Sequence, residues 1–478
     1  MQEKLYFNVS DRPPFGKNLF FALQQLLAIL AATIAVPHIV GNGMSQSAAL
    51  FGAGIGTIVY LLFTRFKSPV FLGSSFAFLG SMSAAFAGAI TFSQNAGYLG
   101  LIIGALLAGL VYVVLAIIVK FVGTKWIDKL MPPVIIGPTV AIIGLSLSGN
   151  AVGDLQTSAV VANTSTWVPL ICGLVTLFVT IVASVYGKKM MKMIPFIIGI
   201  LAGYAVSAIF TGIGYAAGND NLKIINFDLF KNMSWVPDFT FIKAFSSFGD
   251  FGTAGNFFRY FGTVALAYIP VAFVVFAEHI ADHKNLSTII DKDLTKDPGL
   301  DKTLLGDGVG SMAGAFFGGC PNTTYGESIG CVAISKNASI YTILATAIMA
   351  IIVSFFAPFI TFLSTIPNCV MGGVCIALYG FIAVSGLKMV QGVDLSDNRN
   401  LFTVSVILIA GVGGLTISFV NRRTGELILT VTEVACALIL GILVNLISGN
   451  FKRKDTEDKN EQELLADDNI NDNTLGDK

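Results

Sequence analysis

Hydrophobic segments long enough to cross a membrane follow one another along most of this 478-residue chain, and short polar joints separate them. A helix of about 20 apolar residues spans the hydrocarbon core of a bilayer. By this criterion we predict an all-α polytopic membrane protein with fourteen spans, of which the ninth and tenth are short. The spans lie near residues 17–41, 47–65, 69–90, 97–120, 126–148, 166–187, 193–215, 257–282, 305–320, 321–336, 339–365, 367–388, 400–420 and 427–449.

The composition agrees with this class and narrows the chemistry. The chain is 54% hydrophobic and 12% charged, whereas a soluble globular domain has about 25% charged residues. The formal net charge is zero, so no nucleic-acid partner is expected. Only three histidines occur, the six cysteines lie in apolar runs, and no nucleophile–base pair stands on adjacent turns. We therefore expect no metal, no cofactor and no enzymatic activity.

The positions of lysine and arginine predict the orientation of the chain. In multi-pass proteins the short cytoplasmic loops are enriched in basic residues. If the N-terminus is cytoplasmic, all but six of the 29 basic residues fall on the cytoplasmic side. The exceptions are Lys223, Lys231, Lys243, Arg259, Arg422 and Arg423. Because fourteen is even, both termini are predicted to be cytoplasmic, and we expect the protein in the inner or plasma membrane.

A long polar joint, residues 216–256, divides the predicted spans into two sets of seven. Because seven is odd, the two halves would have opposite orientations in the membrane. Internal similarity supports such an inverted repeat: residues 69–76 match the stretch 320–330, and residues 131–137 match 366–372. Two unrelated glycine-rich packing segments are the alternative. The predicted organisation is a cytoplasmic N-terminus (1–16), a first repeat (17–215), an extracytoplasmic loop (216–256), a second repeat (257–449) and a disordered cytoplasmic tail (450–478).

Polar residues interrupt the tenth predicted span. As one straight helix, residues 321–336 rise only about 24 Å, short of a hydrocarbon core of about 30 Å. If residues 322–326 are extended, the same segment reaches about 33 Å. Non-helical backbone occurs at membrane depth where protein or a watery cavity covers it, and paired interrupted spans mark transporter binding sites. We therefore predict short strands in spans three and ten, with the substrate between them.

Four carboxylates stand within or near the ends of predicted spans, namely Glu278, Asp282, Glu327 and Glu433. An ionisable residue at membrane depth costs a few kcal/mol and is a functional candidate for that reason. Asp282 follows Glu278 by four residues and therefore shares its helix face.

Each of these acids also has a simpler interpretation. Glu278 could be a buried acid paired with Arg259 or with a backbone donor. Glu327 could cap a helix start, although capping is compatible with substrate binding. Asp282 and His283 could be solvated near the cytoplasmic end. For Glu433 we favour an interfacial or dimer-contact acid.

The remaining candidates suggest a substrate chemistry. Two helix starts that meet at mid-membrane would present free backbone N–H groups to a substrate carbonyl. Glu278 and Glu327 would accept N–H groups of the substrate. Together they predict a small, flat, neutral, amide-like ring with Phe76 or Tyr325 against its face. Desolvation favours the protonated form of a carboxyl group, and a helix start opposes this at Glu327, so Glu278 is the predicted proton carrier.

At these residues the sequence resembles the nucleobase–ascorbate transporter family, and within it the bacterial uracil permeases. The similarity covers nearly all of residues 17–450, and its most specific part is the run from proline to glutamate. The motifs are Gly73-Ser74-Ser75-Phe76-Ala77-Phe78, Ala277-Glu278-His279, Pro321-Asn322-Thr323-Thr324-Tyr325-Gly326-Glu327 and Met371-Gly372-Gly373-Val374.

The resemblance implies a core domain of spans one to four and eight to eleven, and a gate domain of spans five to seven and twelve to fourteen. It implies that Glu278 and Glu327 hold a uracil ring, that backbone at Phe76 and Gly326 contacts it, and that Tyr325 lies beside it. It also implies proton symport by alternating access of core against gate, and a homodimer formed through the gate domains. The expected partners are uracil or a similar nucleobase, protons, the lipid bilayer and a second copy of the chain.

The chain departs from the family pattern at several positions. Uracil permeases often carry histidine where this chain has Asp282, so Asp282 joins Glu278 as a candidate for proton coupling. The glutamine–histidine pair of span one is Gln24-Gln25 here, and Ser328 and Ser335 replace asparagine and threonine. Purine transporters commonly carry glutamine at the position of Glu327, so the acid favours a pyrimidine. A purine (xanthine or urate) symporter remains the alternative. An anion transporter of the same fold comes next, but the two acids Glu278 and Glu327 in the site would disfavour an anion.

Overall fold

The structure is a computed structural model that describes residues 5–157, 167–188, 190–420 and 427–449. The predicted disordered tail, 450–478, lies outside the described residues. Helices α1 to α10 form the first half: α1 (Phe15–Val40), α2 (Gln46–Phe63), α3 (Leu79–Ala89), α4 (Gln94–Val122), α5 (Lys125–Leu130), α6 (Pro133–Ser146), α7 (Ser148–Asp154), α8 (Trp167–Tyr186), α9 (Met190–Met193) and α10 (Pro195–Ala217). The second half contains α11 (Thr240–Ser246), α12 (Ala254–Ile290), α13 (Leu300–Gly318), α14 (Gly326–Ser335), α15 (Ile340–Ser354), α16 (Ala357–Ser364), α17 (Asn368–Val390), α18 (Asn398–Val412) and a last helix, Glu433–Gly449.

Among the described residues, eight helices are long and apolar enough to cross a membrane, or nine if the bent pair α15 and α16 is counted as one span. Shorter apolar helices, Phe76–Ala89, Asn398–Val412 and Glu433–Gly449, lie within the predicted spans three, thirteen and fourteen. The chain is therefore a multi-pass membrane protein, and the full count of fourteen spans stays a prediction.

The two predicted short strands are confirmed. β1 (Leu72–Ser74) and β2 (Asn322–Thr324) pair antiparallel in the middle of the molecule, with Gly73 opposite Thr323. The Ser75 N–H donates to the Pro321 carbonyl at 2.9 Å, and the Tyr325 N–H donates to the Phe71 carbonyl at 3.2 Å. A Cβ at Gly73 would lie 2.3 Å from the Tyr325 ring, so only glycine leaves room for this ring.

One part of the all-α prediction is wrong. Residues near the junction of predicted spans thirteen and fourteen form a second antiparallel pair, β3 (Ile417–Val420) and β4 (Leu427–Val431). Helix α18 ends at Val412, and Gly413 and Gly414 follow it directly, with Gly414 at a φ of 70°. Glycine disfavours helix continuation, and the β-branched residues that follow favour extended backbone.

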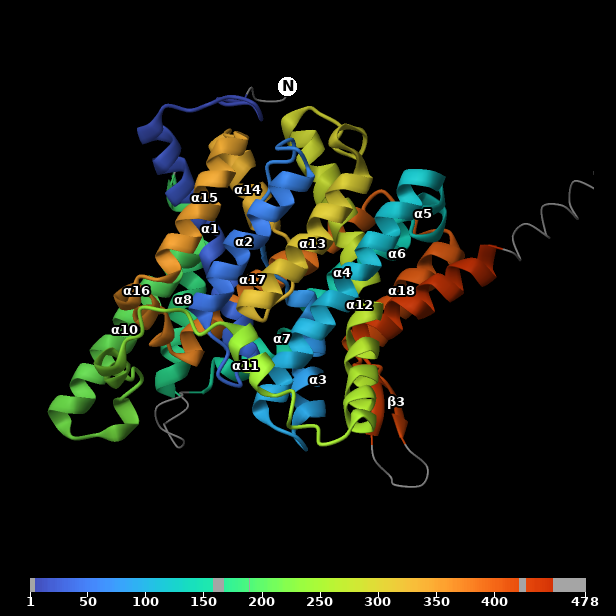
Figure 1. Cartoon of the computed structure of the whole chain (residues 1–478). Coiled ribbons are helices and arrows are strands. Elements are labelled where there is room, and N and C mark those ends of the chain that lie inside the picture. The colour runs from blue at the N-terminus through green and yellow to red at the C-terminus, as the bar shows by residue number, and fades with distance from the viewer. Residues whose placement is uncertain (1–4, 158–166, 189, 421–426, 450–478) are drawn as a thin grey trace, which may run out of the picture.

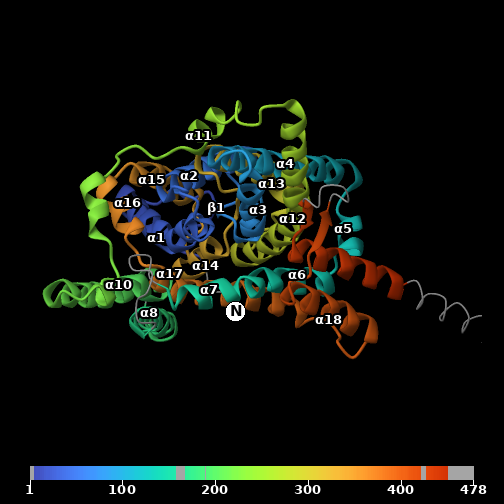
Figure 2. The ribbon, with the colours of Figure 1, turned by 90° about the horizontal axis from the view of Figure 1, so that it is seen from below.

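The helices pack in two groups, visible side by side in Figure 2. In one group α2 packs against α13 and α15, and α4 packs against α12 and α13. In the other group α17 packs against α6 and α8, with α10 on α8 and α18 on α6. Glycines allow the backbones of α2 and α13 to approach closely, because a Cβ at Gly52 would lie 2.4 Å from the Gly314 carbonyl oxygen. We call these the α2–α13 group and the α17 group.

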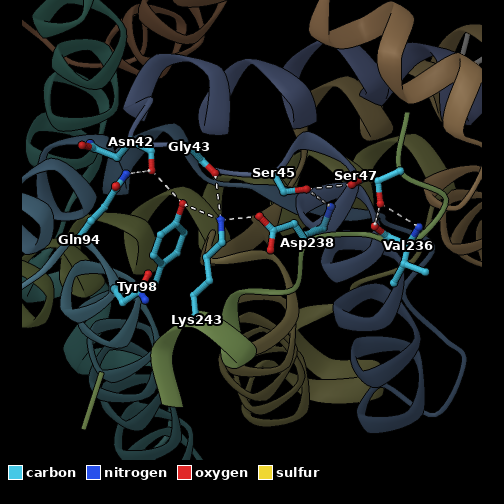
Figure 3. Close-up of polar contacts among 12 residues, drawn as sticks. Asn42, Gly43, Ser45, Ser47, Gln94, Tyr98, Val236, Asp238 and Lys243 are labelled. Atoms are coloured by element: carbon cyan, nitrogen blue, oxygen red, sulfur yellow. Dashed lines mark hydrogen bonds and ion pairs between the residues drawn. The ribbon is translucent and has the colours of Figure 1, made fainter. Parts of the chain in front are cut away.

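The long joint between the halves runs from α10 to α12 and lies on the opposite side of the molecule from the N-terminus (Figure 1). Figure 3 shows how Lys243 of α11 fastens this joint. Its ammonium forms an ion pair with Asp238 and donates to the Tyr98 hydroxyl at 3.3 Å and to the Gly43 carbonyl at 3.5 Å. Partial burial lowers the pKa of Lys243, but the hydrogen bonds to Asp238 and Tyr98 outweigh it, so the pKa is raised overall.

Candidate substrate site

A cavity of about 480 Å³ lies between the two helix groups, within the range of about 300 to 1,000 Å³ typical of small-molecule sites. It contains every residue that the sequence analysis proposes for substrate or proton. One wall comes from α12 of the α2–α13 group together with α1, the strand pair and α14, and it contains Ala28, Ser75, Phe76, Ala77, Glu278, Ala281, Asp282, Asn285, Thr323, Thr324, Tyr325, Gly326, Glu327, Gly330, Cys331 and Ile334. The other wall contains Val140, Ile143, Ser184, Lys192, Met193, Pro195, Phe196, Phe381, Ile382, Val384, Ser385 and Lys388.

The strand pair brings two helix starts to this cavity. Phe76 opens the helical segment after β1, and Gly326 opens α14 after β2. Backbone N–H groups in the first turn of a helix have no partner within the helix and carry partial positive charge. Apart from the chain neighbours of Gly326 and the backbone of its own helix, no atom of the described residues lies within 4 Å of a Cβ built there, and Gly326 lines the cavity. The site can therefore donate hydrogen bonds from backbone to a carbonyl oxygen.

Glu327 stands in the first turn of α14, beside a buried junction that the sequence analysis did not foresee. The Gln25 amide of α1 donates to the Ser328 hydroxyl at 2.5 Å and to the Ser328 carbonyl at 3.2 Å. The Phe71 N–H donates to the same hydroxyl at 3.0 Å. Gln25 and Ser328 are two of the departures from the family pattern, and here they are partners that fix the helix start carrying Glu327.

Glu278 and Asp282 reach the cavity from consecutive turns of α12, as their spacing predicted. The Thr324 hydroxyl at the end of β2 donates to Asp282 at 2.7 Å, so Asp282 belongs to the site rather than to bulk solvent. The pairing of Glu278 with Arg259 is excluded because both lie on the single helix α12. Nineteen residues of helix separate them by about 28 Å.

The two aromatic candidates, Phe76 and Tyr325, were expected against the face of the substrate ring, and each also contacts other parts of the protein. The Tyr325 hydroxyl donates to the Ser74 carbonyl at 2.7 Å, and its ring packs on Gly73, so Tyr325 fastens the strand pair while lining the cavity. The Phe76 ring meets the edge of Tyr379 of α17, with ring centroids 5.6 Å apart. Tyr379 was not predicted. Its only sequence signal was an aromatic residue in the span that follows the Met371–Val374 motif.

Three further buried groups were missed or misplaced. Asp307 lies in the ninth predicted span but was not counted among its acids, and it is 1% exposed. Its carboxylate oxygen lies 2.7 Å from Nδ1 of His279, which was noted only as part of a motif. His283, for which solvation was considered, is also 1% exposed, so that interpretation is wrong. Glu433 begins the last helix and is not part of the cavity wall.

The fold is that of known anion transporters. The chain superposes on the transmembrane domain of the cyanobacterial bicarbonate transporter BicA with a TM-score of 0.61 at 14% identity, covering 92% of this chain and 99% of that one. It superposes on the inward-facing murine anion transporter Slc26a9 with a TM-score of 0.63 at 11% identity, covering 93% of this chain and 69% of that one. At such identities the similarity concerns the fold alone.

Sequence comparison is more specific. The family model described as "Permease family", that of the xanthine and uracil permeases, matches residues 16–419. The chain is 37% identical to a uracil permease of Bacillus caldolyticus over 93% of this chain and 95% of that protein. It is 35% identical to one of Bacillus subtilis (95% and 98%) and 34% identical to one of Escherichia coli (92% and 93%). The family predicted from the sequence motifs is therefore confirmed: this chain belongs to the permease family of xanthine and uracil transporters.

Proposed function

We propose that this protein imports uracil, and that the cavity between the two helix groups is the substrate site. The observation that supports this most is that two acids, Glu278 and Glu327, and two helix starts line one cavity of suitable size. Uracil is flat and neutral, with two ring N–H groups and two carbonyl oxygens. The site offers acceptors for the former and backbone donors for the latter.

The ring lies between strand pair and α12 in this proposal. Glu327 and Glu278 accept the two N–H groups, and the backbone N–H groups at Phe76 and Gly326 donate to the carbonyl oxygens. The Phe76 ring covers one face, and Tyr325 holds the strands at the correct spacing. Charge-assisted hydrogen bonds are about twice as strong as neutral ones, so the two carboxylates contribute most to affinity.

Import is coupled to protons in this proposal. Glu278 is the proton carrier, and Asp282, one turn along α12, shares this role. Both face the cavity, and the Thr324 hydroxyl that donates to Asp282 belongs to β2, so a change of charge at Asp282 reaches the strand that contacts the substrate. A carboxyl group between protein and a watery cavity can bind a proton on one side of the membrane and release it on the other.

Alternating access would move the α2–α13 group, as core, against the α17 group, as gate. The packing of the described helices supports the division, because it unites spans one to four with spans eight to eleven. The cavity wall contains Lys192 and Lys388, which stand on the predicted cytoplasmic side, so this state would face inward. Fourteen spans in inverted repeats, cytoplasmic termini, an inner or plasma membrane location and a homodimer through the gate complete the proposal.

A xanthine or urate symporter is the second candidate, because the matching family model includes xanthine permeases. The acid at position 327 favours a pyrimidine over it. An anion transporter would require a site without two acids, so the likeness to BicA does not extend to its cargo in this proposal.

The test is a panel of unlabelled bases against purified protein, read by thermal shift and by competition with radiolabelled uracil. A ligand that binds the native state raises its apparent stability. Uracil should raise the melting temperature, and xanthine and urate should not. If xanthine alone raises the melting temperature, the substrate is a purine rather than uracil. Proteoliposome uptake that is unchanged when the pH gradient is collapsed would contradict symport.

A further inference from the structure

On the side of α12 that faces away from the substrate cavity, a second cluster of titratable groups is buried in packed protein. It consists of His279 and His283 of α12, Asp307 of α13 and Tyr60 of α2, and we call it the histidine cluster. His279, Tyr60, His283 and Asp307 are each at most 1% exposed. None of the four forms part of the cavity wall. We propose that the histidine cluster is a proton-binding site that takes up one proton during transport.

His279 stands between two partners on α13. Its Nδ1 lies 2.7 Å from an Asp307 carboxylate oxygen, and its Nε2 lies 3.1 Å from the Thr303 hydroxyl. The Thr303 hydroxyl has a second possible acceptor, the Leu300 carbonyl at 3.1 Å. In the neutral ring Nδ1–H donates to Asp307 and Nε2 accepts from Thr303. After protonation Nε2–H donates to the Thr303 oxygen, and the Thr303 hydroxyl turns to the Leu300 carbonyl.

His283 repeats this arrangement one turn further along α12. Its Nδ1–H donates to the His279 carbonyl at 2.8 Å, and its Nε2 lies 2.7 Å from the Tyr60 hydroxyl. Tyr60 in turn reaches the Ser68 hydroxyl at 2.7 Å. A neutral His283 accepts from Tyr60, whereas a protonated His283 donates to Tyr60, whose hydroxyl then turns to Ser68. Each ring can thus gain a proton when one hydroxyl rotates. The ring nitrogens and the rotating hydroxyl then keep a hydrogen-bond partner in both protonation states.

The capacity of the cluster is one proton. The two rings are stacked with centroids 4.0 Å apart, and two positive charges at that distance in a low-dielectric interior repel strongly. A single positive charge is balanced by Asp307. The other groups facing the rings are uncharged: Tyr112 of α4 meets His279 edge-on at 6.1 Å, and Tyr60 comes from α2. The acids Glu278 and Asp282 stand on the cavity side of α12.

The cluster connects two regions of the molecule. Ser68 directly follows Lys67, which forms an exposed ion pair with Asp297 at 2.5 Å, so one end of the network lies next to the surface. At the other end, the second Asp307 oxygen has no hydrogen-bond partner in the described part of the chain. Asp307 lines a pocket of about 10 Å³, about the size of one water molecule, together with Thr323, which also lines the substrate cavity.

The first test is independent of any substrate. The chain contains three histidines, so ¹³C-histidine labelling of the purified full chain gives three ring signals, and His38→Gln identifies the one outside the cluster. Followed by NMR between about pH 5 and 9, the signals of His279 and His283 should shift together and account for one proton in total. Asp307→Asn should alter this titration. If both rings stay neutral throughout, or if each gains a proton independently, the proposal is wrong.

The second test rests on the proposed uracil symport and uses proteoliposomes. Tyr60→Phe removes only the hydroxyl that joins His283 to Ser68. It should leave uracil binding within about threefold of wild type, but lower accumulation driven by a pH gradient at least fivefold. Tyr268→Phe is the matched control, since Tyr268 is equally buried on α12 and its hydroxyl has no hydrogen-bond partner among the described residues. If Tyr60→Phe accumulates uracil as well as Tyr268→Phe does, the histidine cluster has no role in coupling. If the wild type does not bind uracil, only the proposed substrate is refuted.

Discussion

Two faces of one helix, α12, carry ionisable groups in opposite surroundings. Glu278 and Asp282 face a cavity of about 480 Å³ that also contains Lys192 and Lys388. One residue further along, His279 and His283 face closely packed protein. There His279 is hydrogen-bonded to Asp307 and Thr303, and His283 is hydrogen-bonded to Tyr60 and to the His279 carbonyl. A helix turns by about 100° per residue, so adjacent residues necessarily point to different environments.

The difference teaches how a membrane protein can separate recognition from charge storage. An acid in a watery cavity can exchange hydrogen bonds with a substrate, because solvent or substrate satisfies it in each state. A titratable group in packed protein needs a hydrogen-bond partner from the protein in each protonation state. Here the hydroxyl groups of Tyr60 and Thr303 provide it. The cavity face should therefore determine what binds and carry a proton at Glu278, and the packed face should supply a further proton-binding site.

The largest expected effect is the loss of substrate binding in Glu327→Ala. This change removes the carboxylate at the α14 start, and hydrogen bonds to charged groups contribute about 1.5–3 kcal/mol. Together with the altered helix start we expect a rise in the uracil Kd of about 100-fold, measured by equilibrium binding to purified protein. Glu433→Ala removes an acid outside the cavity and is the control. Equal affinity in the two variants would show that Glu327 does not contact the substrate.

A smaller effect on binding, but a complete effect on coupling, is expected for Glu278→Gln. The glutamine keeps a carbonyl acceptor for a ring N–H but cannot bind or release a proton near neutral pH. Uracil affinity should fall by about tenfold or less, and uracil exchange across proteoliposomes should persist. Accumulation against a concentration gradient should disappear. A variant that still accumulates uracil when a pH gradient is imposed would remove Glu278 from the role of proton carrier.

An intermediate effect is expected at the junction that holds Glu327 in place. Gln25→Ala and Ser328→Ala each break the buried contact between α1 and α14, which contributes about 1 kcal/mol. Each should raise the KM for uracil by about fivefold. Because both remove the hydrogen bond between the Gln25 amide and the Ser328 hydroxyl, the effect of the double variant should be less than the sum of the two single effects. Fully additive effects would mean that Gln25 and Ser328 act separately.

The smallest effect is expected far from both faces of α12, at Lys243. Lys243→Met removes the ion pair with Asp238, and exposed or half-exposed pairs contribute about 0–1 kcal/mol. The pKa of Lys243 is raised in the folded state, so its contribution is complete below the ordinary lysine pKa and is lost only as the pH rises through the higher folded value. The melting temperature should fall slightly at pH 7 with unchanged uracil affinity. A change in affinity would assign the joint between α10 and α12 to the substrate site.

Much of the site could be predicted from the sequence because its groups are conspicuous in apolar surroundings. An acid such as Glu278 or Glu327 stands out within a hydrophobic span, and a segment too short for a helix indicates extended backbone, which β2 confirmed. The histidine cluster gave no such signal, because His279 of α12 and Asp307 of α13 meet only in the folded structure, where both helices pack against α4. The hairpin of β3 and β4 was missed because an apolar run does not distinguish strand from helix.

The contact between Gln25 and Ser328 is a second feature that the sequence alone does not predict. Gln25 and Ser328 were each seen as a departure from the family pattern, 303 residues apart in the chain. Their contact depends on how α1 crosses the start of α14, which a single sequence does not reveal. The acids of the cavity could thus be predicted, whereas the neutral groups that position them required the three-dimensional arrangement.

The most direct test of the account is equilibrium binding of radiolabelled uracil to two purified variants that each lose one buried acid. Glu327→Ala changes the cavity face, and Asp307→Asn changes the packed face of the same domain. We expect the uracil Kd to rise by about 100-fold in Glu327→Ala and to stay within about threefold of wild type in Asp307→Asn. The reverse order, with binding lost in a folded Asp307→Asn and kept in Glu327→Ala, would contradict the assignment of recognition to the cavity and of proton storage to the histidine cluster.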